Sequence, residues 1–308
     1  MENQLVTVIG GAGFVGRHLV HLLAAEGYRI RVLVRDTVAA EFLKTQATVG
    51  QIVIEHADIT RPETFAGKFA GSQAVVNLAG IFYESGRQTF ERLHIECARA
   101  VALEAKRAGV PVLVHLSALG VDSAGGTRYG SSKLAGEKAM RLVFPDAIAL
   151  RPSLIVGPED GFFQRFGRMR LISPILPLVA GGKTRFQTVL VTDVARAIVA
   201  AIRTPAAKGK TYELAGPQTY SLRGLLERMA DITRRKTFFV SIPAPLAAFI
   251  GRICEALPFP PLLTRDQVKL LAHDNVLTPA ALTFAQLGIT PASIEDGLSH
   301  YLDRFIKV

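Results

Sequence analysis

Short apolar, β-branched runs alternate with amphipathic stretches over the first half of the chain. The runs have the length and composition of buried strands and fall at 5–9, 30–34, 51–55, 74–78, 112–116 and 147–150. Between them, apolar residues recur at helical spacing in 14–26, 86–108 and 129–144. Strands that alternate with helices predict an α/β fold, in which helices cover both faces of a Rossmann-type, doubly wound parallel sheet.

The alternation ends at Pro152. Beyond it, prolines interrupt the chain, and the pattern predicts a helix at 192–202, a strand at 211–214, a helix at 221–233 and three further helical stretches up to Phe305. We therefore predict a dinucleotide-binding domain of residues 1–152, to which 186–205 returns. The segments 153–185 and 206–308 are predicted to form a smaller, mostly helical C-terminal region that binds a substrate or a partner.

A glycine-rich turn joins the first predicted strand to the first helix without a gap. The run is Gly10-Gly11-Ala12-Gly13-Phe14-Val15-Gly16, which satisfies G-x-G-x-x-G from Gly11. The first N–H groups of a helix have no partner inside the helix, so a diphosphate can accept hydrogen bonds from them. Glycines at 10, 11 and 13 let the backbone approach the phosphates, and Gly16 lets the helix pack on the strand. This stretch predicts a dinucleotide site.

The end of the second strand carries the residues that choose between cofactors. A carboxylate about 20 residues beyond the glycines holds the ribose 2′-OH of NAD(H), whereas an arginine there suits the 2′-phosphate of NADP(H). This chain has both, as Arg35 and Asp36. Because Arg17 follows the last glycine, two guanidinium groups could converge on one phosphate. We therefore favour NADP(H), with NAD(H) as the alternative.

Three further segments are predicted to line the cofactor, because each follows a strand at the same edge of the sheet. Asp58 and Ile59 are placed to meet the adenine, although Asp58 could equally be a plain turn residue. The segment Leu78-Ala79-Gly80 has small side chains that leave room for a nucleotide. Pro152 and Ser153, at the end of the sixth strand, complete the predicted set.

Three polar residues could carry out chemistry at this edge. Tyr129 and Lys133 are four residues apart on a predicted helix, so both project from one face. A tyrosine is a poor acid or base at neutral pH, but a nearby cation favours its phenolate, and lysine also has donors for a ribose. Ser117 ends the fifth strand, where its hydroxyl could hydrogen-bond a substrate carbonyl.

The net charge of +10 lies almost entirely after residue 160, outside the dinucleotide half. No nucleic-acid-binding motif accompanies it, so we expect no nucleic acid partner. The stretch 161–185 holds five basic residues and no acidic one among its apolar side chains. It suits an anionic membrane surface or an acidic partner, and a solvated loop over the substrate cleft is an equally good interpretation. The stretch 244–257 could be a second apolar contact.

Targeting signals and cysteines bear on the compartment. Met1-Glu2-Asn3 lacks the features of a signal peptide, and no segment reaches the ~20 apolar residues of a membrane-spanning helix. Cys97 and Cys254 are too few for a disulfide framework and have no histidines at metal-binding spacing, so we expect buried thiols and no metal. We expect a cytoplasmic protein, which the stretch 161–185 could hold at the inner face of the inner membrane.

These motifs resemble the short-chain dehydrogenase/reductase superfamily, in its extended or atypical branch. The matching residues are Gly10, Gly13, Gly16, Asn77-Leu78-Ala79-Gly80, Ser117, Tyr129, Lys133 and Arg151-Pro152. The resemblance implies that the tyrosine exchanges a proton with the substrate oxygen while hydride moves at nicotinamide. It also implies that the serine polarises that oxygen, and that the lysine holds the ribose and lowers the tyrosine pKa.

Two positions depart from the superfamily pattern. Ala118 stands where sugar-nucleotide epimerases usually carry a second hydroxyl residue, which counts against epimerase chemistry. His94 stands where relatives often place an asparagine that relays protons, and a packed helix histidine is the simpler interpretation.

A closer resemblance covers nearly the whole chain. The segments 85–88, 144–147, 157–160, 212–217 and 263–268 are similar to the nucleotide-binding accessory subunits of respiratory complex I. That resemblance implies a tightly held NADPH with a structural or assembly role at the quinone-reducing arm. The first hypothesis is therefore a complex I accessory-subunit-like or assembly-related protein. The second is an NADP-dependent oxidoreductase that reduces a hydrophobic carbonyl compound with Ser117, Tyr129 and Lys133.

Overall fold

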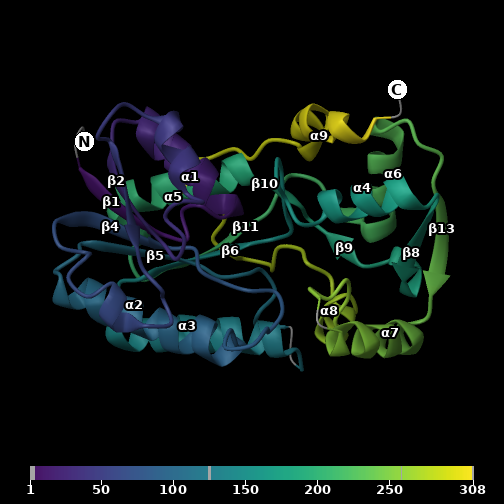
Figure 1. The fold of residues 1–308 in the computed structure, drawn as a ribbon, viewed down its shortest axis with the longest axis horizontal. Helices are drawn as coiled ribbons and strands as arrows, with labels where there is room; N and C mark the ends of the chain where they lie inside the picture. The colour runs from purple at the N-terminus through teal and green to yellow at the C-terminus, as the bar shows by residue number, and fades with distance from the viewer. Residues whose placement is uncertain (1–3, 124–125, 258, 307–308) are drawn as a thin grey trace.

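A seven-stranded sheet organises the larger part of the molecule (Figure 1). The structure, a computed structural model, describes residues 4–123, 126–257 and 259–306. The strand order is β11-β6-β5-β4-β1-β2-β3, and every neighbouring pair is parallel. The strands are β1 (Leu5–Ile9), β2 (Arg29–Val34), β3 (Ile52–His56), β4 (Ser72–Asn77), β5 (Val112–Leu116), β6 (Ile148–Pro152) and β11 (Thr211–Leu214). The predicted parallel α/β sheet is confirmed, and the predicted strand 211–214 pairs with β6 as its seventh member.

Helices cover both faces of this sheet, as predicted (Figure 1). Helices α1 (Phe14–Ala25) and α5 (Val191–Arg203) pack on one face. Helices α2 (Cys97–Arg107) and α3 (Arg128–Val143) pack together on the other. The two apolar cores differ in their main contributors, since valine and isoleucine from the strands meet leucines of α1 on one face and alanines of α2 on the other.

The smaller region is built from helices and two-stranded ribbons around a third core. Its strands are β7 (Ile155–Val156), β8 (Ile175–Val179), β9 (Arg185–Phe186), β10 (Val189–Leu190), β12 (Tyr220–Ser221) and β13 (Phe238–Ile242). They pair as β7 with β10, β9 with β12, and β8 with β13. Its helices are α4 (Phe163–Ile172), α6 (Leu222–Ile232), α7 (Ala244–Ala256), α8 (Arg265–Leu270) and α9 (Ile294–Leu302). This region lies beyond one end of the seven-stranded sheet (Figure 1).

Short helical turns connect these elements. They are η1 (Glu41–Gln46), η2 (Pro62–Thr64), the π-helical turn η3 (Glu91–Glu96), η4 (Ala180–Gly182), η5 (Pro205–Ala207), η6 (Phe284–Leu287) and η7 (Asp303–Phe305). The helix predicted to begin at Gly86 begins only with η3, because Ser85 and Gln88 exchange backbone hydrogen bonds in a turn. Among the described residues, no helix is long and apolar enough to cross a membrane.

The C-terminal segment ties the two parts together. The backbone of Asn275 accepts a hydrogen bond from the Gln187 N–H (2.9 Å) and donates one to the Arg185 carbonyl (2.7 Å). Farther along, Leu282 forms a parallel bridge with Tyr212 of β11 and so extends the sheet edge. Residues distant in sequence therefore reach the carboxyl ends of the strands, where the predicted site lies.

Candidate functional site

The turn between β1 and α1 has the geometry of a phosphate cradle. Gly10 has φ +77, and its carbonyl accepts a hydrogen bond from the Gly13 N–H at 3.0 Å. Gly13 is the N-cap of α1 and has no side chain to bond the first N–H groups of the helix. A Cβ on Gly16 would lie 2.4 Å from the Gly10 oxygen, so only glycine lets α1 start this close to β1. The start of the helix is free to receive an anion.

The other residues of the turn form its walls. Val15 is buried, whereas Ala12 and Phe14 are half-buried and pack against the core on the α1 side of the sheet. Arg17 donates to the Ala12 carbonyl at 3.3 Å, and its guanidinium lies 4.9 Å from the centre of the Phe42 ring. Arg17 is thus held against the turn by protein groups.

Arg35 has different surroundings from Arg17. It lies at the carboxyl end of β2 and lines a cavity of about 110 Å³ at the strand ends. The lining residues are Arg35, Asp58, Thr60, Arg61, Arg87, Gln88 and Arg92. Burial would raise the pKa of Asp58, but hydrogen bonds from Thr60 and the charges of Arg35 and Arg61 hold it below its usual value. One carboxylate against four arginines leaves the cavity positively charged.

Sequence reasoning missed three of these arginines, namely Arg61, Arg87 and Arg92. The sequence predicts one continuous helix over 86–108, which gives no reason to place Arg87 at the cavity. In the structure, residues 85–88 form a turn that directs Arg87 toward the cavity. The neighbouring predicted residues have local roles. The carboxylate of Asp36 accepts the Ala39 N–H at 2.9 Å, and the Ile59 carbonyl accepts from the Cys97 thiol at 2.9 Å.

The strand order reverses between β1 and β4, which is where ligands bind in open α/β sheets. The Leu78 N–H donates to the Ile9 carbonyl (3.1 Å), and the Ala79 N–H donates to the Asn77 side chain (3.1 Å). Gly80 follows, and a Cβ there would lie 2.8 Å from Nζ of Lys133. The absence of a side chain at Gly80 therefore lets the predicted lysine reach the crevice.

Ser117, Tyr129 and Lys133 come to this crevice from β5 and α3. The hydroxyl of Ser117 is buried and has no hydrogen-bond partner among the residues that the structure describes, so it is available to a ligand. Nζ of Lys133 donates to the Leu116 carbonyl at 3.2 Å. The ring of Tyr129 is stacked on Phe82 at 5.0 Å and meets the edge of His94 at 5.7 Å.

The protonation of Tyr129 differs from the sequence expectation. We expected Lys133 to favour the phenolate, but burial raises the pKa of Tyr129 and keeps the phenol neutral. Burial also lowers the pKa of Lys133 to about 8, against the charge of Glu137, which raises it. In this state Tyr129 can give a proton to a ligand but is not poised to take one.

His94 is a packed, neutral residue. Burial, followed by the charge of Lys133, lowers its pKa to about 3. Its Nε2 accepts the Ile81 N–H at 3.1 Å, so Nδ1 carries the proton and donates to Ser132 at 2.8 Å. The structure favours the interpretation of His94 as a helix histidine that fixes the loop after Gly80.

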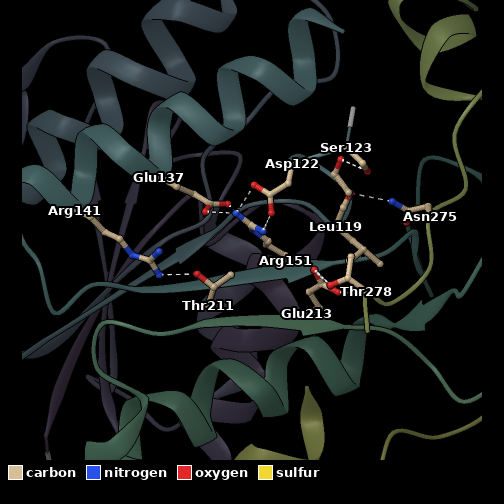
Figure 2. A network of polar contacts seen from close by, with 11 residues as sticks. Leu119, Asp122, Ser123, Glu137, Arg141, Arg151, Thr211, Glu213, Asn275 and Thr278 are labelled. Carbon is tan, nitrogen blue, oxygen red and sulfur yellow. Dashed lines mark hydrogen bonds and ion pairs between the residues drawn. The ribbon is translucent and has the colours of Figure 1, made fainter. Parts of the chain in front are cut away.

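The helix that carries Tyr129 and Lys133 is anchored by contacts that the sequence did not reveal. Asp266 of α8 accepts the backbone N–H groups of Arg128 (2.8 Å) and Tyr129 (2.9 Å) and so caps the start of α3. On the other side, Arg151 of β6 forms a buried ion pair with Glu137 of α3 and also bonds Asp122 (Figure 2). Only the tertiary structure reveals these pairs, because their members lie far apart in the sequence.

The C-terminal segment closes the same edge. The Ser153 hydroxyl donates to Oδ1 of Asn275 at 2.6 Å. Nδ2 of Asn275 donates to the Leu119 carbonyl at 2.9 Å (Figure 2). The Leu119 N–H in turn bonds the Pro152 carbonyl at 2.9 Å. Pro152 and Ser153 therefore lie at the crevice with their polar groups engaged. Among the described residues, no group of three His, Cys, Asp or Glu side chains could hold a metal ion.

Comparison with known proteins identifies the family. Residues 6–215 match the NAD dependent epimerase/dehydratase family. The chain belongs to this family. The match covers β1 from Val6 onward and all the other strands of the seven-stranded sheet, and it confirms the predicted extended branch of the short-chain dehydrogenases/reductases.

Two curated relatives of this epimerase/dehydratase chain cover nearly all of it. Subunit 9 of the mitochondrial NADH dehydrogenase [ubiquinone] 1 alpha subcomplex of Arabidopsis thaliana is 32% identical over an alignment of 318 positions, which covers 100% of this chain and 79% of the relative. The ceramide reductase of Caulobacter vibrioides is 28% identical over 309 residues, 98% and 94% of the two chains. The match to the Arabidopsis subunit confirms the predicted similarity to complex I subunits.

A solved structure shares the fold of the family. The UDP-glucose 4-epimerase of Bifidobacterium longum, in complex with NAD+ and UDP, superposes with a TM-score of 0.73 at 17% identity and covers 97% of each chain. The family and the glycine turn support a nicotinamide dinucleotide as the cofactor of this protein. The uncapped start of α1 and the unpartnered Ser117 hydroxyl fit such a group.

Proposed function

We propose that this protein binds NADP(H) along the carboxyl edge of the sheet and keeps it as a structural group. The uncapped start of α1 would receive the diphosphate, and Lys133 would hold the ribose beside nicotinamide. The positive cavity around Arg35 supports NADP(H) over NAD(H), since a 2′-phosphate brings the negative charge that four arginines match. Release of the nucleotide from freshly purified protein tests this, and recovery of NAD would contradict it.

Replacing Arg35 should remove the preference for the phosphorylated cofactor. Arg35→Ala is expected to weaken NADPH binding roughly tenfold to a hundredfold while NADH binding stays unchanged, because a hydrogen bond to a charged group contributes about 1.5–3 kcal/mol. Fluorescence titration measures both affinities. Arg29→Ala is the matched control, since Arg29 is exposed at the opposite end of the same strand. Equal losses for NADPH and NADH would refute the assignment.

The biological role that we propose is that of a complex I accessory-subunit-like or assembly-related protein. The similarity to the Arabidopsis subunit over the whole chain, including the C-terminal region, supports this role. We place the protein in the cytoplasm, at the inner face of the inner membrane, where it would meet complex I and an anionic lipid surface. Deletion of the gene should lower the amount of assembled complex I, and unchanged assembly would count against the role.

The second candidate function is NADP-dependent reduction of a hydrophobic carbonyl compound, which the similarity to ceramide reductase favours. The bound dinucleotide would supply a hydride to the carbonyl carbon. Ser117 has a buried, unpartnered hydroxyl that could hold the carbonyl oxygen. Tyr129, kept neutral by burial, would give its proton to that oxygen to form the alcohol. Lys133 would then help to restore the proton on the tyrosine.

The Tyr129→Phe variant separates the two functions. It removes the proton donor, so reduction of any carbonyl substrate should fall by about 10²–10⁴-fold. Nucleotide retention and complex I assembly should be unchanged, because the stacked ring remains. Tyr212→Phe in β11 is the matched control. If complex I assembly falls with Tyr129→Phe while Tyr212→Phe has no effect, then chemistry at Tyr129 is part of the role.

A further inference from the structure

Helix α7 presents an exposed apolar stripe. Leu246, Phe249 and Ile253 fall at helical spacing on one face and are 49%, 61% and 50% exposed. The opposite face, with Ala247 and Gly251, is buried. Exposed apolar side chains continue beyond the helix at Leu257, Phe259 and Leu262. A contiguous stripe of this kind is uncommon on the surface of a protein that works alone in water.

The ribbon of β8 and β13 adds a second exposed apolar surface at the same end of the molecule (Figure 1). Phe238 and Val240 are 61% and 49% exposed on one face of β13, and Ile175 lies opposite Phe238 in the register. On the inner face of β8, Leu176 and Leu178 are buried in the third core. We call the exposed residues Ile175, Phe238 and Val240, together with the α7 stripe, the docking surface.

The segments that build this end carry more positive than negative charge, and Glu255 near the end of α7 is paired with Arg265 at 2.8 Å. Between 161 and 192, and again between 232 and 254, the sequence has no Asp or Glu. The basic residues of these two segments are Arg165, Arg168, Arg170, Lys183, Arg185, Arg234, Arg235, Lys236 and Arg252. Arg165 donates to the Leu262 carbonyl at 2.8 Å and Arg170 to the Thr237 hydroxyl at 2.9 Å, which are neutral partners that do not cancel the charge.

We propose that the docking surface lies on an anionic phospholipid bilayer, with α7 in the plane of the interface. Apolar side chains flanked by arginines fit a layer whose headgroups are negative and whose interior is apolar. A second copy of the chain would instead bring like charges together. The sequence indicated 161–185 as a contact and 244–257 as a second apolar contact, and Arg185 of the first stretch is engaged by Asp274 at 2.8 Å. The surface we propose is built by α7, which lies in the second stretch, and by β13.

The docking surface is connected to the nucleotide site through two helices. Gly251 of α7 packs so closely on the start of α8 that a Cβ would lie 3.0 Å from the Arg265 nitrogen. The next residue, Asp266, caps the helix that carries Tyr129. A bilayer bound at α7 would therefore lie at a defined position relative to the crevice. This proposal deepens the membrane placement within the proposed function, and its failure would leave nucleotide binding intact.

Vesicle flotation of the full-length protein with its bound nucleotide tests the proposal. We expect binding to phosphatidylcholine vesicles that contain phosphatidylglycerol, little binding to phosphatidylcholine alone, and release at high salt. The double variant Phe249→Ser with Ile253→Ser should bind on the order of tenfold more weakly. Arg168→Gln and Arg252→Gln should each weaken binding about fivefold.

The matched control is the double variant Leu103→Ser with Leu142→Ser, which removes exposed leucines from α2 and α3 and should bind as the parent does. Nucleotide content and the unfolding midpoint of each variant show that the fold is kept. Absence of binding to anionic vesicles would overturn the proposal, as would equal binding of the Phe249 and Ile253 double variant. So would a dimer that this variant abolishes, because the surface would then serve a second copy.

Discussion

Gly13→Val is expected to abolish nucleotide binding and to leave the folded protein nearly as stable as before. Gly13 is exposed and has φ −73, which any residue can adopt. A Cβ there would lie 3.2 Å from the Gly10 oxygen, a contact that a small shift relieves. The branched side chain would, however, occupy the space through which phosphate oxygens reach the start of α1. Loss of two or more charge-assisted hydrogen bonds should lower affinity on the order of a hundredfold or more.

Isothermal titration with NADPH and NADH, together with thermal unfolding of the nucleotide-free protein, measures both parts of this prediction. Gly161→Val is the matched control, because a Cβ at Gly161 would meet nothing within 4 Å and its backbone is not in the left-handed region. Unchanged affinity in Gly13→Val would refute the position proposed for the diphosphate. Gly16→Val is unsuitable for this test, since its clash with the turn would unfold the protein.

Glu137→Ala should destabilise the protein strongly, because it removes one partner of a buried ion pair. Glu137 is 2% exposed and receives two hydrogen bonds from Arg151, at 2.9 and 2.8 Å (Figure 2). Removing one partner of a buried pair leaves the other charge uncompensated, which costs about 3–5 kcal/mol. Asp122 still bonds Arg151, which sets the expectation at the lower end of that range.

Guanidinium unfolding measures the change in the free energy of unfolding. The matched control is Glu227→Ala, whose partner Arg223 lies in the same helix on the surface, and there the expected loss is about 0–1 kcal/mol. A loss for Glu137→Ala no larger than the control would mean that this pair does not anchor α3.

A milder variant, Glu137→Gln, should keep the fold and loosen the position of Lys133. We expect faster nucleotide dissociation from this variant than from the parent protein.

The strands and the glycine turn could be predicted because their signals are local. The run Leu5–Ile9 has four aliphatic residues around one threonine, and so apolar a run needs burial on both faces whatever surrounds it. The turn at Gly10–Gly16 needs glycine for contacts made within a few residues. The same reasoning was wrong at Gly86, where helical spacing continued through residues that form a turn. The spacing of apolar residues does not show where backbone hydrogen bonds, such as those between Ser85 and Gln88, form a short turn.

The candidate site was predicted only in part, for a related reason. Tyr129, Lys133 and Ser117 could be singled out because they follow a strand or share a helix face, and their role stays a prediction. Arg61, Arg87 and Arg92, which share the cavity of Arg35, were not found, because each belongs to a different loop or turn. The protonation of Tyr129 was also misjudged, since spacing gives the distance to a cation but not the depth of burial.

The sequence by itself determined the parallel sheet, its dinucleotide turn and the family, because these depend on short-range patterns of apolar residues and glycines. The tertiary structure decided which charges meet. Asp266 reaches the start of α3, Glu137 reaches Arg151, and the apolar stripe of α7 stays exposed at a positively charged end of the molecule. Long-range pairing and exposure depend on how complete elements pack, and no local pattern encodes them.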